Sequence, residues 1–238
     1  EARIDDGAWF ALAADAATAG DYTGTTPALA DGEYAYALRA TDTAGNVASA
    51  GPVAFAIDNT APQILVGGIA DGDIVAHAVT PTVTITDAHP ASQSITLNGA
   101  AYVSGTAITA SGSYVLAVEA TDAAGNRGEA RVAFTLDLDA PNVVITAPLD
   151  GAIVDTATIA VTGTTEALAK VELDVGAFAT HVFADANGVF GVNGVALQQG
   201  ANTVRARATD RAGNVGAFAT IQVTYTPAAA TALTGTLA

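Results

Sequence analysis

One eight-residue loop occurs three times in this chain, as ATDTAGNV (residues 40–47), ATDAAGNR (120–127) and ATDRAGNV (208–215). Asp122 follows Asp42 by 80 residues, and Asp210 follows Asp122 by 88. A period of this length is the size of a whole domain, not of a small solenoid unit. The repeated loop therefore predicts similar domains in tandem.

The segments on both sides of each loop alternate between apolar and polar residues. EYAYALRATD, SYVLAVEATD and NTVRARATD precede the loops, and VAFAID, RVAFTLD and ATIQVTYT follow them. Period-two alternation predicts strands that are buried on one face. The Gly-Asn pair between them favours a tight turn, so each loop is predicted to close a β-hairpin.

Further short strands are predicted ahead of the second and third loops, in QILVGG, PTVTITD, NVVITAP and TIAVTGTTE. GVFGVNG (188–194) lacks the spacing of a phosphate-binding loop and is interpreted as hairpin turns. Seven short strands with frequent turns, and no sustained helical period, predict an all-β fold of tandem immunoglobulin-like β-sandwich domains in a linear array.

The predicted domains are 1–58, 59–137 and 138–226, and residues 227–238 are a linker or the start of a next domain. The first domain lacks the opening strands of the other two. We expect upstream sequence to complete it, and the alternative is a strand from another chain.

Aromatic residues occur at matching places in the repeats. Tyr34 and Tyr114 stand eight residues before the loop aspartate, where a tyrosine hydroxyl bonds nearby backbone in immunoglobulin-like domains. Another set flanks a turn in each repeat and is predicted to pack against the sheets, the alternative being a carbohydrate platform: Trp9, Phe10, Tyr102 and Phe178.

The composition excludes several classes of function. With 8 Lys+Arg against 24 Asp+Glu, the formal net charge of −16 disfavours nucleic acid and suits divalent cations. The chain has no Cys, and no apolar run of 18 residues that would predict membrane insertion. Three isolated histidines (His77, His89 and His181) and the absence of a Gly-x-Ser-x-Gly elbow give no support to a catalytic site, so we expect no enzyme.

The junctions between predicted domains are FAIDNTAP (55–62) and FTLDLDAP (134–141). Together with the A-T-D-x-A-G-N loops, they resemble the bacterial immunoglobulin-like repeats of large secreted adhesins, surface-layer proteins and multidomain exoproteins. The resemblance covers roughly residues 1–226. It implies domains stacked as rods, in an extracellular or cell-surface location, some of which bind Ca²⁺ between neighbours.

Carboxylates are expected to gather where each domain begins. In a sandwich, the entry segment, the loop after the second strand and the last hairpin loop share one pole, and Ca²⁺ prefers such oxygen ligands. The predicted metal ligands are Asp58, Asp87 and Asp122 at the entry pole of the second domain, and Asp137, Asp139, Glu166 and Asp210 at that of the third.

A simpler alternative is open for the loop aspartates, because Asp readily caps its own turn. The loop asparagines are interpreted as structural turn residues, at Asn46, Asn126 and Asn214. Asp31 and Asp71, in turns at the opposite pole, are further candidates to join a metal site.

Three functions remain open on the sequence alone. The first is a non-catalytic stalk or spacer of a cell-surface or secreted protein, stiffened by Ca²⁺ and partnered by neighbouring domains of its parent chain. The second is an accessory module that binds a carbohydrate or a protein of the host or matrix. The third is a subunit of a surface layer or filament that self-associates by strand exchange.

Overall fold

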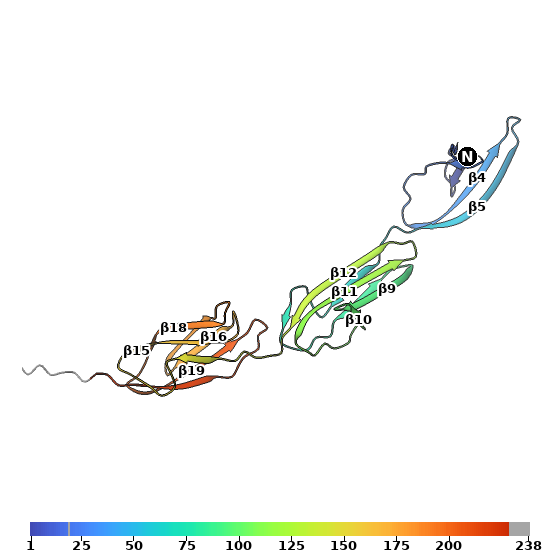
Figure 1. The fold of residues 1–238 in the computed structure, drawn as a ribbon. Coiled ribbons are helices and arrows are strands. Elements are labelled where there is room, and N and C mark those ends of the chain that lie inside the picture. Colours follow the sequence, from blue (N-terminus) through green and yellow to red (C-terminus); the bar gives the residue numbers. More distant parts are fainter. Residues whose placement is uncertain (19, 229–238) are drawn as a thin grey trace, which may run out of the picture. The chain divides into compact units, whose positions relative to one another are not determined.

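A computed structural model describes residues 1–18 and 20–228. Within these residues the chain forms twenty strands and no helix (Figure 1). No described helix is therefore long and apolar enough to cross a membrane. The all-β prediction is confirmed. Of the predicted linker, only residues 227–228 are described, and the remainder lies outside the described residues.

The chain divides into two compact units, whose boundary runs through the second predicted domain. The first unit comprises residues 1–67, 82–104 and 116–131, and the second comprises 68–81, 105–115 and 132 onward. β11 (Gly112–Asp122) and β12 (Arg127–Leu136) contribute residues to both. The division into three domains stays a prediction, and "first, second and third repeat" below mean residues 1–58, 59–137 and 138–226.

The first unit contains small antiparallel sheets. In the first repeat, β4 and β5 form a long curved hairpin with β1 on the other side of β4, while β2 pairs with β3 (Figure 1). β6 pairs with β8, and β9 pairs with both β10 and β11. The strands are β1 (Ala2–Ile4), β2 (Ala13–Ala14), β3 (Tyr22–Thr23), β4 (Gly32–Thr41), β5 (Val47–Ile57), β6 (Gln63–Gly67), β8 (Thr82–Thr86), β9 (Pro90–Leu97) and β10 (Ala100–Ala101).

The second unit contains a complete two-sheet sandwich in the third repeat. One sheet has the order β13-β15-β18 and the other β14-β20-β19-β16-β17. The strands of this unit are β7 (Ile74–Val75), β13 (Val144–Ala147), β14 (Ala152–Val154), β15 (Thr158–Thr164), β16 (Lys170–Val175), β17 (Phe178–Phe183), β18 (Val189–Ala196), β19 (Gly200–Thr209) and β20 (Ala219–Tyr225).

The core of this sandwich follows from the alternation seen in the sequence. Val204, Ala206 and Ala208 on β19 point inward, and the residues between them point to solvent. They pack in one buried cluster with Val161 of β15 and Phe190 of β18. The interpretation of residues 188–194 as turns was wrong, because 189–194 belong to β18, which pairs with β15. Its apolar side chains are needed to fill this core.

Candidate functional site

The three repeated loops fold in the same way. Gly45, Gly125 and Gly213 adopt positive φ angles of 87°, 97° and 98°, which glycine accepts without strain and which let the hairpin reverse. In each loop the aspartate accepts hydrogen bonds from the asparagine four residues later. The Asn46 amide donates to Asp42 Oδ1 at 2.9 Å, and its side-chain Nδ2 donates to Oδ2 at 2.8 Å.

The second and third loops have an additional hydrogen bond. Asn126 Nδ2 also donates to the backbone carbonyl of Asp58 at 2.9 Å, and Asn214 Nδ2 donates to that of Asp137 at 2.8 Å. The loop asparagine therefore ties the segment that leads into its repeat to the hairpin of that repeat. Sequence reasoning assigned these asparagines to the turn alone and missed this second contact.

The same two loops bring acidic groups together. Carboxylate oxygens of Asp58, Asp87 and Asp122 lie within 4.8 Å of one another in the first unit. Those of Asp137, Glu166 and Asp210 do the same in the second unit. Six of the seven predicted metal ligands thus fall into two groups of three, built from equivalent places in two repeats.

Asp139, the seventh predicted ligand, lies outside these groups. It is exposed, and its backbone amide donates to Asp137 Oδ1 at 3.1 Å. Asp31 and Asp71 are also elsewhere. Asp31 accepts from the amide of Asn59 at 2.7 Å and from the Thr60 hydroxyl, and Asp71 accepts from the amide of Ala133 at 2.8 Å.

Turn capping and clustering are both properties of the loop aspartates. Asp122 is only 2% exposed and Asp210 only 8%, and each uses both carboxylate oxygens as hydrogen-bond acceptors within its loop. Burial alone would raise the pKa of Asp122. The hydrogen bonds from Asn126 and the loop amides outweigh it and hold that pKa below its usual value. The carboxylate is therefore kept charged.

Glu166 shows the opposite effect. Its pKa is raised above the usual 4.5, first by partial loss of solvent around the carboxyl, although the residue is exposed overall, and then by the charges of Asp210 and Asp137. Like charges held this close repel each other, and a cation among them removes the repulsion. In the other group, His89 Nδ1 lies 3.1 Å from Asp58 Oδ2 and places a nitrogen beside the carboxylates.

The entry segments approach the hairpins closely, and two glycines make this possible. A Cβ on Gly128 would lie 2.2 Å from the Pro62 carbonyl oxygen, and one on Gly216 would lie 2.0 Å from that of Pro141. Real Cβ atoms do not come this near to backbone oxygen. Glycine is therefore required beside each acidic group, a constraint that sequence reasoning did not identify.

The predicted aromatic residues pack against the protein. Tyr34 donates its hydroxyl to the Ala30 carbonyl at 3.0 Å, and Tyr114 donates to that of Ala110 at 2.8 Å. Trp9 is half-buried and lies under the guanidinium groups of Arg3 and Arg39, which are 5.1 and 4.4 Å from its ring centre. Phe10, Tyr102 and Phe178 are half-buried as well.

Comparison with known proteins gives matches to two family models, each over part of the chain. Residues 2–59 match the family model described as bacterial Ig-like domain. Residues 2–59 are therefore similar to a bacterial immunoglobulin-like domain. Residues 141–225 match a second model, described as glucodextranase, domain B. The immunoglobulin-like resemblance and the tandem β-sandwich fold expected from the sequence are thus confirmed.

Solved structures of immunoglobulin-like and related modules are also similar. A tetra-tandem repeat from the extending region of a large adhesion protein is 24% identical, with a TM-score of 0.41 over 93% of this chain and 64% of that one. Fibronectin(III)-like modules of Clostridium thermocellum CbhA are 16% identical, with a TM-score of 0.38 over 69% of this chain and 95% of that one. A 1.5-MDa bacterial ice-binding adhesin is 22% identical, with a TM-score of 0.31, over 82% and 75%. No curated protein matches the chain.

Proposed function

We propose that this chain is a non-catalytic structural segment of a bacterial cell-surface or secreted adhesin-like protein. Its immunoglobulin-like repeats act as a spacer, and Ca²⁺ bound at the two acidic groups fixes each entry segment to the repeat that follows. Its partners are then neighbouring repeats of the same parent chain. The location and the adhesin-like role rest on the resemblance of the junctions and loops.

One observation carries the calcium proposal: the same convergence occurs twice. In each case an aspartate of the entry segment, an acidic residue just after β8 or β15 and the buried hairpin aspartate meet within 4.8 Å. Three carboxylates supply three to six oxygen atoms, and Ca²⁺ takes six to eight, so water and backbone carbonyls would complete the shell. In the group of Asp137, Glu166 and Asp210 every side-chain donor is a carboxylate oxygen, which favours a hard cation over zinc.

The ligands come from segments that only the fold brings together. Asp58 and Asp137 lie in the entry segments, and their partners lie in loops of the repeat that follows. A bound cation would attach the entry segment to those loops more tightly than the asparagine contact alone. This is how binding would stiffen a junction.

The accessory binding module receives less support. A carbohydrate platform needs exposed ring faces, whereas Trp9 is covered by two arginines and the three matching rings are half-buried.

Calorimetric titration of the metal-free chain with CaCl₂, and separately with MgCl₂, tests the proposal. We expect two Ca²⁺ per chain and weaker binding of Mg²⁺. Asp87→Asn should remove one site and Glu166→Gln the other. Asp155→Asn, a change at an exposed residue outside both groups, is the control and should leave both. Absence of saturable Ca²⁺ binding, or two sites remaining in both site variants, would contradict it.

A further inference from the structure

The inner face of β4 is open where its counterparts are buried. Counting back from the loop aspartate, positions six, four and two are Leu116, Val118 and Ala120 in the second repeat and Val204, Ala206 and Ala208 in the third. All six are at most 3% exposed. The matching residues of the first repeat are Tyr36, Leu38 and Ala40, of which Tyr36 is 38% and Leu38 37% exposed, while Ala40 is also exposed.

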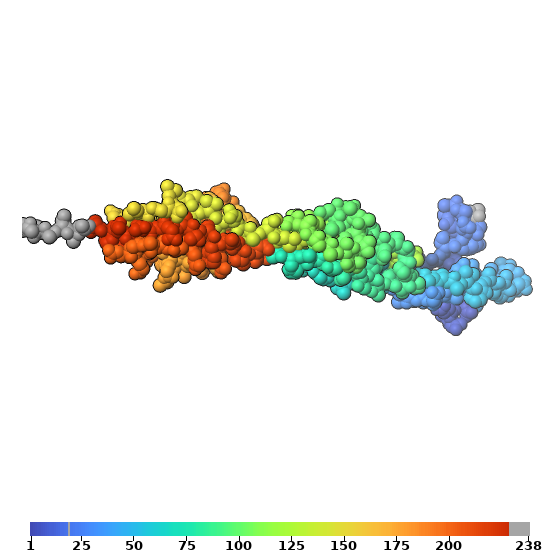
Figure 2. Space-filling view, turned by 90° about the horizontal axis from the view of Figure 1, so that it is seen from below, coloured from blue at the N-terminus to red at the C-terminus, as the bar shows by residue number. Residues whose placement is uncertain are grey.

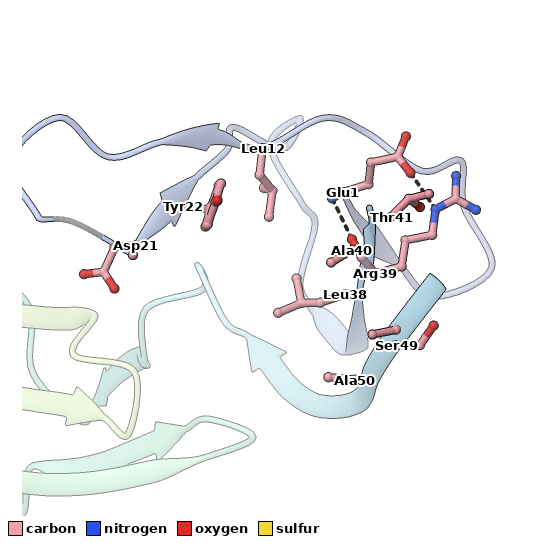
Figure 3. Close-up of a pocket in the computed structure, with 12 residues that line it drawn as sticks. Glu1, Leu12, Asp21, Tyr22, Leu38, Arg39, Ala40, Thr41, Ser49 and Ala50 are labelled. Carbon is pink, nitrogen blue, oxygen red and sulfur yellow. Dashed lines mark hydrogen bonds and ion pairs between the residues drawn. The ribbon is translucent and has the colours of Figure 1, made fainter. Parts of the chain in front are cut away.

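A hollow lies over this face. It has a volume of about 1090 Å³, and Leu38 lines it together with Leu12 and Tyr22 from the β2–β3 region (Figure 3). In the space-filling view the β2–β3 region and the β4–β5 hairpin stand apart as separate lobes (Figure 2). In the third repeat, the matching face is covered by the sheet β13-β15-β18. The described residues of the first repeat contain no counterpart of β13 or β15.

The edge of the sheet is open as well. β7 pairs with β12, and β14 pairs with β20, in both cases as a parallel strand. Among the described residues, β5 pairs with β4 alone. A free edge of this length presents unpaired backbone groups that can accept another strand.

The loop of the first repeat lacks a matching contact. Asn126 and Asn214 donate to the carbonyl of an entry-segment aspartate, while within the described chain Asn46 Nδ2 donates to Asp42 alone. In the first repeat, the face of β4, the edge of β5 and the loop asparagine thus lack the contacts that an entry segment and its strands make in the other two repeats.

We propose that the open face and edge of the β1-β4-β5 sheet bind a β-segment of the same repeat type, equivalent to residues 58–93. One of its strands would run parallel to β5, as β7 and β14 run beside β12 and β20. Its apolar side chains would cover Tyr36, Leu38 and Ala40. A second folded copy of this chain is a poor source, because its own entry strands are already paired, β6 with β8 and β13 with β15.

One residue constrains the fit. Ala48 stands six residues after Asp42, where the other repeats have Gly128 and Gly216. A Cβ at those glycines would collide with the carbonyl of the entry proline. The segment must therefore pass further from Ala48 than it does from the glycines, and Ala48→Gly should let a peptide from the second repeat bind more tightly.

A synthetic peptide of residues 58–93, added to the full chain in calcium-containing buffer, is the probe. We expect saturable one-to-one binding by calorimetry, and protection of β5 amides from hydrogen exchange. Leu38→Asp should weaken binding at least ten-fold, because it puts a charge on the covered face. Leu149→Asp, the same change at a residue that is 75% exposed in the second unit, should have no effect. Ala48→Gly should strengthen binding.

The outcomes separate this proposal from its alternatives. No binding to either the original chain or Ala48→Gly, or equal binding to Leu38→Asp, would overturn it. Concentration-dependent association of the chain without peptide, abolished by Leu38→Asp, would also overturn it and show that a second copy covers the face. Asp58 and Asp87 of the bound peptide would form a third calcium site with Asp42. This third site rests on the proposed function. Peptide binding with no added Ca²⁺ would uphold this inference whether or not the two acidic groups bind Ca²⁺.

Discussion

At the residue scale, the loop aspartates and asparagines hold the hairpins and the acidic groups in place. Asp122 and Asp210 are buried acids, which are costly unless they are well bonded, and each is satisfied by its own loop. Asn126 and Asn214 then reach across to the entry segment. One loop sequence therefore both shapes a hairpin and positions a carboxylate beside two others.

Removing the side-chain amide of a loop asparagine should lower the stability of the fold most where that amide also bonds the entry segment. Asn126→Ala deletes the bonds to Asp122 Oδ2 and to the Asp58 carbonyl, and we expect it to lower the free energy of unfolding by about 1–3 kcal/mol. Asn46→Ala deletes a single exposed side-chain bond and should have a smaller effect. Urea unfolding of both variants measures the difference. Equal losses would show that the bond to the entry segment contributes nothing.

Glu166 gives a prediction for pH dependence without metal. Because its pKa in the folded chain lies above 4.5, the folded state holds this proton more tightly than the unfolded state does. Its contribution to stability therefore falls as the pH rises from about 4.5 through the raised pKa. In EDTA, Glu166→Gln should raise the melting temperature at pH 7 and lose this advantage at pH 4.

The matched variant Glu33→Gln should change neither melting temperature. A Glu166→Gln chain that melts lower than the original at pH 7 in EDTA would contradict the repulsion inferred among Glu166, Asp210 and Asp137.

At the element scale, the repeats differ in how completely two sheets face each other. β16 and β19 of the third repeat lie against β15 and β18, whereas β4 has an open inner face. The hairpins, their turns and their alternation were predictable because they depend on local patterns. The open face was predictable only as missing strands, since no pattern within β4 distinguishes a covered side chain from an uncovered one.

Leucine truncations should report this difference. Leu173 is 1% exposed within the third-repeat core, so Leu173→Ala should cost about 2–5 kcal/mol of stability. Leu38→Ala, on the open face, should cost less than about 1 kcal/mol. Thermal unfolding followed by circular dichroism would measure both. A large cost for Leu38→Ala would mean that the face is covered in solution.

The glycine beside each acidic group offers a second test at this scale. Gly216→Ala should push the Pro141 carbonyl away and displace Asp137 with it, which should weaken Ca²⁺ binding at that group at least ten-fold. A Cβ on Gly191 would meet nothing nearer than 3.7 Å, so Gly191→Ala is the control. Unchanged calcium affinity in Gly216→Ala would show that the entry segment does not position the ligands.

The sequence predicted the two acidic groups better than their surroundings. Repetition marked Asp122 and Asp210, and sandwich topology placed the entry aspartates and the acidic residues after β8 and β15 beside them. Asp139 was included because it neighbours Asp137, yet a local turn directs the chain so that Asp139 stays exposed. The glycine contacts were not predictable, because they depend on how closely two segments approach in three dimensions.

At the scale of the whole molecule, a repeated fold carries a repeated cluster of acidic side chains. The net charge of −16 is an average over the chain, whereas six acidic residues are concentrated in two groups. Such concentration lowers stability without a cation and raises it with one, because anything that binds the folded state alone stabilises it. Calcium and folding should therefore be linked in the full chain.

Calorimetric melting of the full chain in 2 mM CaCl₂ and in EDTA tests this link most directly, where ~2 mM suits sites as weak as extracellular calcium modules. We predict a higher melting temperature in calcium, with most of the difference lost in the double variant Asp87→Asn, Glu166→Gln. Superimposable curves for the original chain in calcium and in EDTA would contradict the account.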